Sequence, residues 1–256
     1  MDEVFGPKNV EAARSALAQG LATDASHAIG DHMSLATACY VLGEFAAVGP
    51  QLRAAADVWS TVSRNPDAYK TAFGALSLEN PWNEACWVLD GLAITIVPVA
   101  AIFRPEATSG VLRALRDRGD LSKLRQSAAY ATLNLYLGSA WASGPSRAAA
   151  FVDATLDTWE IDGDFFDYGE LYGDSDPWLL AWSSLHRNDV EGFGHHLGAL
   201  AKRRQDMIAR DSGMLNAHTL LGLDLVWLLC AAERMGVSAG GVASDMLSFW
   251  RSWSIC

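Results

Sequence analysis

The spacing of apolar residues is the feature that most restricts the fold of this chain. Through most of its 256 residues, apolar side chains recur at three- and four-residue intervals, which places them on one face of a helix. Alternating apolar and polar runs between turn residues, the pattern of strands, are almost absent. The spacing therefore predicts an all-α fold.

Glycine, proline, asparagine and aspartate divide this pattern into separate helices. The predicted helices are residues 9–27, 31–48, 51–63, 67–78, 82–103, 106–117, 121–142, 146–160, 177–188, 189–210, 214–235 and 241–253. Asp31 is the expected N-cap of the second helix and Gly49-Pro50 its stop, while Asp176, followed by proline, is expected to cap the helix from 177. About eleven or twelve helices with short connections predict antiparallel pairs, stacked into a bundle or curved solenoid. No repeat of fixed period and no long linker is present, so we expect residues 1–256 to form a single domain.

The composition supports a large hydrophobic core. Half of the chain is hydrophobic and only 19% is charged, which excludes wholesale disorder. The most apolar stretch, residues 85–103, contains Asp90, Gly91 and Pro98, so it predicts a buried helix with a kink or break, not a membrane span. The N-terminal sequence has early acids and no apolar core, unlike a secretory signal. We therefore expect a soluble, cytoplasmic protein without a membrane partner.

The four cysteines are expected to be reduced thiols. They are far apart and include no CxxC pair: Cys39, Cys86, Cys230 and Cys256. Three of them lie in apolar, helix-like surroundings, which favours burial in a cytosolic protein over a disulfide framework.

One short segment holds nearly all of the charge imbalance. The chain has 30 acidic and 19 basic residues, a net charge of −11, and nine of the acids fall between residues 153 and 176 with no basic residue among them. Without this segment the count is 21 acids against 19 bases, a net charge of −2. Such a cluster is tolerated when it is well solvated, binds cations or meets a basic partner.

Nucleic acid is not expected as a direct partner, because phosphate contacts require clustered lysine and arginine. Two modest basic groups have aspartate neighbours, and we interpret both as solvated helix faces. These groups are Arg113, Arg116, Arg118, Lys123 and Arg125, and Lys202, Arg203 and Arg204.

A metal site is a weak interpretation of the acidic segment. Asp162, Asp164 and Asp167 lack the spacing and closing glutamate of a calcium loop. An aspartate-rich diphosphate-binding helix would require acids on one helical face and a second motif, whereas glycine and phenylalanine interrupt the acids here. We therefore expect no metal and no cofactor.

Catalysis by paired carboxylates is a second interpretation of the acidic segment, as in an all-α toroidal glycosidase with two carboxyls roughly 5 to 10 Å apart. Aromatic residues accompany the acids, but toroidal enzymes are usually longer, and Trp178 and Trp182, four residues apart, are more typical of core anchors. The histidines include no i, i+4 pair suited to zinc, and His218 stands alone in an apolar run. The sequence also lacks a P-loop, a GxGxxG and a GxSxG motif, so we expect a protein that is not an enzyme.

A protein-binding surface explains the segment best. The glycines between Asp162 and Asp176 predict a loop, in which carboxylates would steer encounter with a basic cleft and aromatic residues would anchor the complex. A solvated loop that only maintains solubility is the simpler alternative. The residues that we expect to contact a partner are Asp162, Asp164, Asp167, Tyr168, Glu170, Tyr172 and Asp174.

The sequence from Asp176 onward adds a family resemblance. It consists of DPWLLAWSSLHRNDVEGFGHHLGALAKRRQ and then MLNAHTLLGLDLVWLLCAAERMGV, with Phe193 four residues after Asp189. This pattern resembles the C-terminal half of the immunity-protein-49 family, all-α proteins of bacterial polymorphic toxin systems, over about residues 176–237. The resemblance implies a cytoplasmic inhibitor that binds a cognate toxin and occludes its cleft. It implies no catalytic residues.

Two other functions stay open from the sequence. One is an α-helical scaffold or regulator that binds a protein or peptide in a groove between helices. The other is a helical-toroid hydrolase that uses carboxylates from residues 153–176.

Overall fold

The computed structural model describes residues 15, 25–64, 84–117, 129–158, 160–161, 164–165, 176–210 and 217–238. Within these residues the regular structure is helical apart from two short strands, which confirms the predicted all-α class. The elements are α2 (Ala25–Val41), α3 (Phe45–Arg64), α5 (Glu84–Phe103), α6 (Pro105–Asp117), α8 (Ala129–Trp141), α9 (Pro145–Thr158), β1 (Glu160–Ile161), β2 (Asp164–Phe165), α11 (Pro177–His186), α12 (Val190–Arg210), α13 (Ala217–Leu221) and α14 (Leu223–Arg234). The helices predicted at 67–78 and 241–253, and most of that at 9–27, lie outside the described residues.

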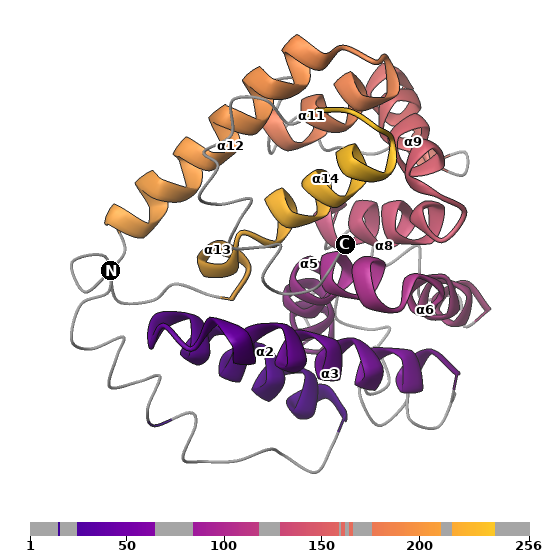
Figure 1. Ribbon diagram of the computed structural model, residues 1–256. Coiled ribbons are helices and arrows are strands. Elements are labelled where there is room, and N and C mark those ends of the chain that lie inside the picture. Colours follow the sequence, from indigo (N-terminus) through magenta and orange to yellow (C-terminus); the bar gives the residue numbers. More distant parts are fainter. Residues whose placement is uncertain are drawn as a thin grey trace.

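The helices form a curved array in which neighbours along the chain pack side by side (Figure 1). α2 packs on α3, α3 on α5 and α6, these two on α8, α8 on α9, α9 on α11, and α11 on α12. Figure 1 shows an arc from α2 at the bottom to α12 at the top, with α13 and α14 across its inner side. The predicted stacking of helix pairs is confirmed, and its form is the curved one.

Left-handed residues at the helix ends produce the tight connections of this array. Gly43 has φ 77°, and the amide of the next residue, Glu44, donates to the Cys39 carbonyl at 2.8 Å. Asn188, with φ 55°, ends α11 in the same way, and the Asp189 amide donates to the Ser184 carbonyl at 2.9 Å. This C-cap satisfies carbonyls at the helix end and turns the chain sharply, so the next helix returns beside the last.

Two predicted boundaries at the start of the array are wrong. Asp31 lies inside α2 instead of capping a helix, and α3 runs through Gly49-Pro50. The turn at Gly43 is the real stop, so the next helix is already formed when it reaches the proline. Pro50 removes one backbone hydrogen bond, yet Val48 and Leu52 on either side of it are buried in the core. Tertiary packing overrides the local signal here.

Tryptophans form the centre of the core. The indole of Trp227 in α14 contacts three others, Trp141, Trp178 and Trp182, with ring centroids 5.4–6.4 Å apart. Trp178 and Trp182 are 2% and 0% exposed, so their i, i+4 spacing marks core anchors, as predicted. Such rings contribute large buried areas, so this cluster joins α8, α11 and α14 firmly.

The apolar stretch at residues 85–103 lies within α5, which contains Pro98 and is buried from Ile96 to Ala101. The prediction of a buried helix is therefore confirmed for residues 96–101, the part of this stretch whose burial the structure describes. No helix in the described part of the chain has the length and apolar character that a bilayer crossing requires. Cys39 and Cys230 are buried free thiols, as expected for these two.

The two ends of the arc meet through α13 and one arginine. α13 contacts both α2 and α12. From α12, the Arg204 guanidinium donates to the carbonyls of Thr219, at 2.8 Å, and Leu220, and to the hydroxyl of Tyr40 in α2 at 3.3 Å. Ile208 and Leu220 form a small buried cluster at the same place, against Tyr40. Arg204 therefore has a structural role, and its interpretation as part of a solvated face is wrong.

The single helix predicted at 214–235 is divided in the structure. Gly222 adopts a left-handed conformation, with φ 62° and ψ 45°, between α13 and α14. Glycine takes this conformation at little cost, whereas other residues are strained there. The break changes the direction of the chain on the inner side of the arc (Figure 1).

Candidate functional site

Most of the predicted contact residues lie outside the described part of the chain. These are Asp162, Asp167, Tyr168, Glu170, Tyr172 and Asp174. Asp164 is in β2, which pairs with β1 in an antiparallel register of Ile161 with Asp164 and Glu160 with Phe165. The expectation of an irregular loop is therefore wrong for residues 164–165, and the helix predicted over residues 146–160 ends earlier, with α9 running to Thr158 and Glu160 in β1. The sequence carries a signal for this pairing, because Asp162-Gly163 lies between the two strands and an Asp-Gly pair favours a two-residue hairpin turn.

The acidic segment starts from a firmly held helix. Asp153 in α9 accepts a hydrogen bond from the hydroxyl of Ser183, which lies in α11, and another, at 2.8 Å, from Nε of Arg187, the C-cap residue of α11. His186 Nε2 lies 3.9 Å from the same carboxylate, which is 14% exposed. Asp153 thus joins α9 to α11, and its charge is matched by an arginine.

The segment ends at the N-cap of α11. Asp176 is 6% exposed, and its Oδ1 accepts a hydrogen bond from the Trp178 amide at 2.8 Å. A carboxylate at this position satisfies a free amide and interacts well with the helix dipole. The predicted cap at Asp176 is confirmed. Asp189 caps α12 in a similar way: its Oδ1 accepts a hydrogen bond from the Gly192 amide at 2.9 Å.

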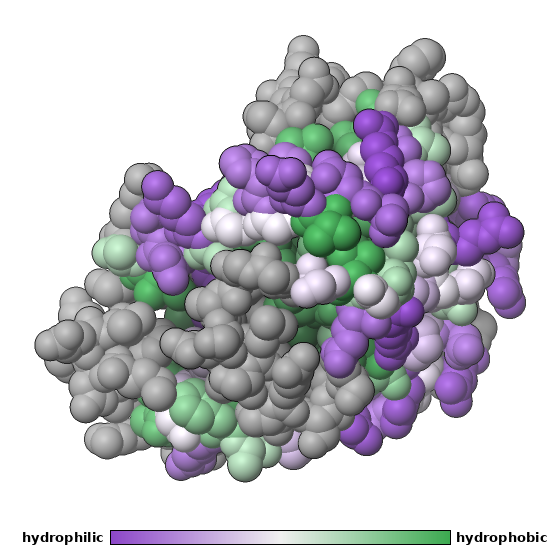
Figure 2. Space-filling view, turned by 45° about the horizontal axis from the view of Figure 1, so that its top comes forward, coloured by the Kyte–Doolittle hydropathy of each residue, from purple (hydrophilic) through white to green (hydrophobic). Residues whose placement is uncertain are grey.

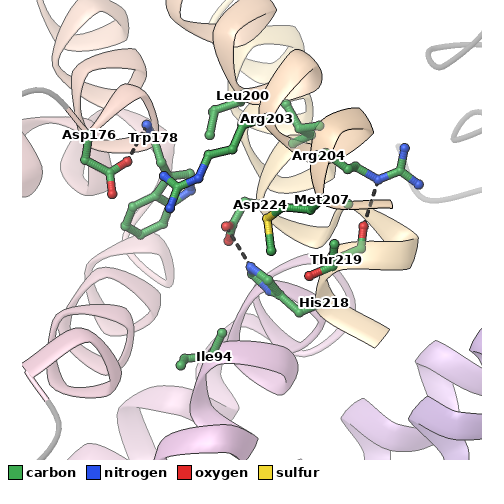
Figure 3. Close-up of a pocket in the computed structure, with 12 residues that line it drawn as sticks. Ile94, Asp176, Trp178, Leu200, Arg203, Arg204, Met207, His218, Thr219 and Asp224 are labelled. Atoms are coloured by element: carbon green, nitrogen blue, oxygen red, sulfur yellow. Dashed lines mark hydrogen bonds and ion pairs between the residues drawn. The ribbon is translucent and has the colours of Figure 1, made fainter. Parts of the chain in front are cut away.

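A cavity lies on the inner side of the arc, where α12 passes over α13 and α14. Its volume is about 250 Å³, and α11 and α5 complete its walls. The side chains that line it come from five helices (Figure 3). Apolar groups predominate: Ile94, Trp178, Leu200, Met207 and Leu225. Small-molecule sites are typically concave and mainly apolar with a few polar groups, so this cavity is the best candidate site in the described residues.

A histidine–aspartate pair forms one side of the cavity. His218 Nε2 lies 2.9 Å from Oδ2 of Asp224, across the break at Gly222 (Figure 3). Burial lowers the pKa of His218, but the Asp224 charge, the hydrogen bond to Asp224 and the Ile94 backbone raise it, and the pKa ends above its ordinary value of 6.5. His218 was expected to stand alone. Its partner is six residues away, which would be on another face of a continuous helix, so only the break brings the two together.

Two arginines of α12 lie at the edge of this cavity. Arg204 turns away from it toward Thr219, whereas Arg203 extends toward Trp178 (Figure 3). Arg203 is exposed, and no carboxylate in the described part of the chain lies within ion-pair distance of its guanidinium. The interpretation of Lys202 and Arg203 as exposed residues is confirmed. The sequence offered no signal that Arg203 borders a cavity.

The remaining histidines do not converge on one site. The rings of His195 and His196 in α12 meet edge to face, with centroids 5.3 Å apart, and burial together with the charge of His195 lowers the pKa of His196. His32 hydrogen-bonds Gln51 at 2.8 Å between α2 and α3. In the described residues, no group of three or more histidine, cysteine or acidic side chains is placed to hold a metal ion.

No protein-family model, no curated protein and no solved structure matches this chain.

Proposed function

We propose that this protein is an immunity-type inhibitor that binds a cognate bacterial toxin and occludes its cleft, with the acidic segment as the docking surface. The observation that carries the proposal is the clustering of nine acids and no base in residues 153–176, the segment that runs from α9 to α11. Asp153 and Asp176 have roles within the frame, as described above, which leaves seven of the nine at residues 157–174. Their charges have no basic neighbour in the segment, so a basic partner would offset them.

The frame around the segment is suited to hold a docking surface. α9 and α11 pack directly against each other, and Asp153 joins them through Ser183 and Arg187. The two residues at which the segment leaves and rejoins the frame, Thr158 and Asp176, are therefore parts of one packed unit. A rigid attachment limits the conformational entropy that is lost on binding.

The rest of the described surface offers little competing apolar contact area. Val190 and Met207, both in α12, are the large hydrophobic side chains that are exposed in the described residues. Figure 2 shows hydrophobic surface in limited areas bordered by hydrophilic side chains on the viewed face. This supports a partner surface that is charged, as the sequence suggests, since broad apolar patches often mark other kinds of interface.

The test uses the protein encoded next to this one, with its toxic activity removed by mutation. Asp164→Lys, Asp167→Lys and Glu170→Lys together should slow association by about tenfold or more at low salt, because steering depends on charge complementarity. The matched control reverses Glu106, Glu191 and Glu233, three exposed acids on α6, α12 and α14, and changes the net charge equally. Association rates are measured by surface plasmon resonance at two salt concentrations.

The outcomes separate the class of protein from the position of its interface. If the first triple variant binds as fast as wild type, the acidic segment is not the docking surface. If both triple variants slow association by the same factor, the rate depends on net charge alone and not on the position of the acids. If the wild-type chain neither binds the neighbouring product nor protects cells from it, the immunity function itself is refuted.

A further inference from the structure

The cavity on the inner side of the arc has a use of its own, separate from the proposed immunity function. We propose that it binds a small apolar monocarboxylate, whose apolar body lies against Trp178, Leu200 and Leu225 and whose carboxylate meets Arg203.

The volume and the apolar walls of the cavity determine the size and the apolar character of the ligand. Its volume of about 250 Å³ lies just below the ~300–1,000 Å³ of pockets for drug-sized ligands, so the occupant is a small molecule. Ile94, Leu200, Met207 and Leu225 are apolar, and the Trp178 indole adds a flat face. An apolar body of this size is transferred favourably from water to such walls.

The charges around the cavity select an anion. Asp224 is paired with His218, and the Asp176 carboxylate accepts a hydrogen bond from the Trp178 amide as the N-cap of α11. Burial lowers the pKa of His218, but the Asp224 charge, the hydrogen bond to Asp224 and the Ile94 backbone raise it above its ordinary value, which favours the charged imidazole beside Asp224. Arg203 adds a positive charge at the edge of the cavity, and no carboxylate of the described residues lies within ion-pair distance of it.

The geometry of that charge favours a carboxylate over a phosphate. A guanidinium donates two parallel hydrogen bonds to a carboxylate, which gives both strength and orientation. Arg204, the other arginine, is occupied by the carbonyls of Thr219 and Leu220 and by Tyr40. One available guanidinium and two nearby acids suit a monoanion, whereas a phosphate dianion would need more donors.

The experiment uses the full chain with two acids and a neutral analogue. Binding of 3-phenylpropionate, octanoate and 3-phenylpropanol is measured by isothermal titration calorimetry and by ligand-observed NMR. We expect at least one acid to bind at micromolar to millimolar concentration. The alcohol 3-phenylpropanol should bind about tenfold more weakly than 3-phenylpropionate, because it loses one charge-assisted hydrogen bond.

Substitutions at exposed positions of α12 test the assignment. Arg203→Gln should weaken the binding of the acids about tenfold and leave the affinity for 3-phenylpropanol unchanged. Arg203→Lys should retain part of the preference for the acid over the alcohol. Lys202→Gln is the matched control: it removes the same charge from the next exposed residue, which does not line this cavity, and should change nothing. Both positions are on the surface, so the variants should fold.

Three results would overturn the proposal. The first is that neither acid binds the wild-type chain at millimolar concentration. The second is that the preference for the acid over the alcohol survives Arg203→Gln. The third is that Lys202→Gln reduces binding as much as Arg203→Gln, which would indicate attraction by net charge alone.

Discussion

Arg204 closes the arc, and its removal should measure how much that closure stabilises the fold. The side chain is half-buried between α12, α13 and α2, and it donates to the carbonyls of Thr219 and Leu220 and to the Tyr40 hydroxyl. α13 has only five residues, so most of its carbonyls have no partner within the helix. Arg204 therefore acts as the C-cap of this short helix.

The expected cost follows from these contacts. Arg204→Met keeps the apolar stem but removes every donor, so two carbonyls lose a partner at about 1 kcal/mol each, the low end of the range for a part-buried site. The Tyr40 contact is long at 3.3 Å and contributes about 0.5 kcal/mol. The free energy of unfolding should fall by about 2.5 kcal/mol in total, which lowers the melting temperature by ~5–10 °C for a chain of this size.

Urea unfolding followed by far-UV circular dichroism measures the change. Arg204→Lys retains the charge and some donors, so its free energy of unfolding should fall by about half as much as that of Arg204→Met. Lys202→Met removes a charge from an exposed position of the same helix, and should stay within ~0.5 kcal/mol of wild type. If Arg204→Met destabilises the protein no more than Lys202→Met, the closure of the arc does not depend on this arginine.

Two further predictions concern the inner helices. Because the folded pKa of His218 is above its ordinary 6.5, the folded state binds the extra proton, so the contribution of the pair to stability is complete below pH 6.5 and is lost as pH rises through the folded pKa. The midpoint of urea unfolding, measured at several pH values, should show this loss of stability as pH rises. Asp224→Asn should abolish the pH dependence and lower the pKa of His218 in an NMR titration. An unchanged pKa of His218 in that variant would contradict the pairing. Gly138→Ala should destabilise by about 1–3 kcal/mol, since its Cβ would lie 2.7 Å from Val97 Cγ1 in α5, whereas Gly30→Ala, with nothing within 4 Å, should be neutral or stabilising. The same urea unfolding compares the two alanine variants, and equal effects would refute the close packing of α5 and α8.

Local signals in the sequence were sufficient wherever a helix boundary depends on the residues beside it. Asp176 followed by Pro177, the turn at Asn188-Asp189 and the Gly144-Pro145 stop all correspond to helix ends in the structure. The same kind of signal failed at Gly49-Pro50, because Gly43 had already ended α2 and packing carries α3 through the proline. It also failed at Gly222, where a glycine within an apolar pattern was compatible with a continuous helix.

The candidate site was much less accessible from sequence. The acidic segment was visible as a charge count, and its proposed contacts stay predictions, because they lie almost wholly outside the described residues. The cavity had no sequence signature, since its walls come from α5, α11, α12, α13 and α14. His218 and Arg203 appeared as an isolated histidine and a surface arginine, and neither residue type alone predicts a site.

The sequence by itself determined the class of this fold, most of its helices and their caps, because these depend on apolar spacing and on hydrogen bonds within a few residues. Only the tertiary structure decided the features that join distant parts of the chain. The contact of Arg204 with Tyr40 spans 164 residues, and the tryptophan cluster joins three helices. Such contacts depend on how buried faces match once the helices pack, and a left-handed glycine that turns one helix into two decides which side chains meet.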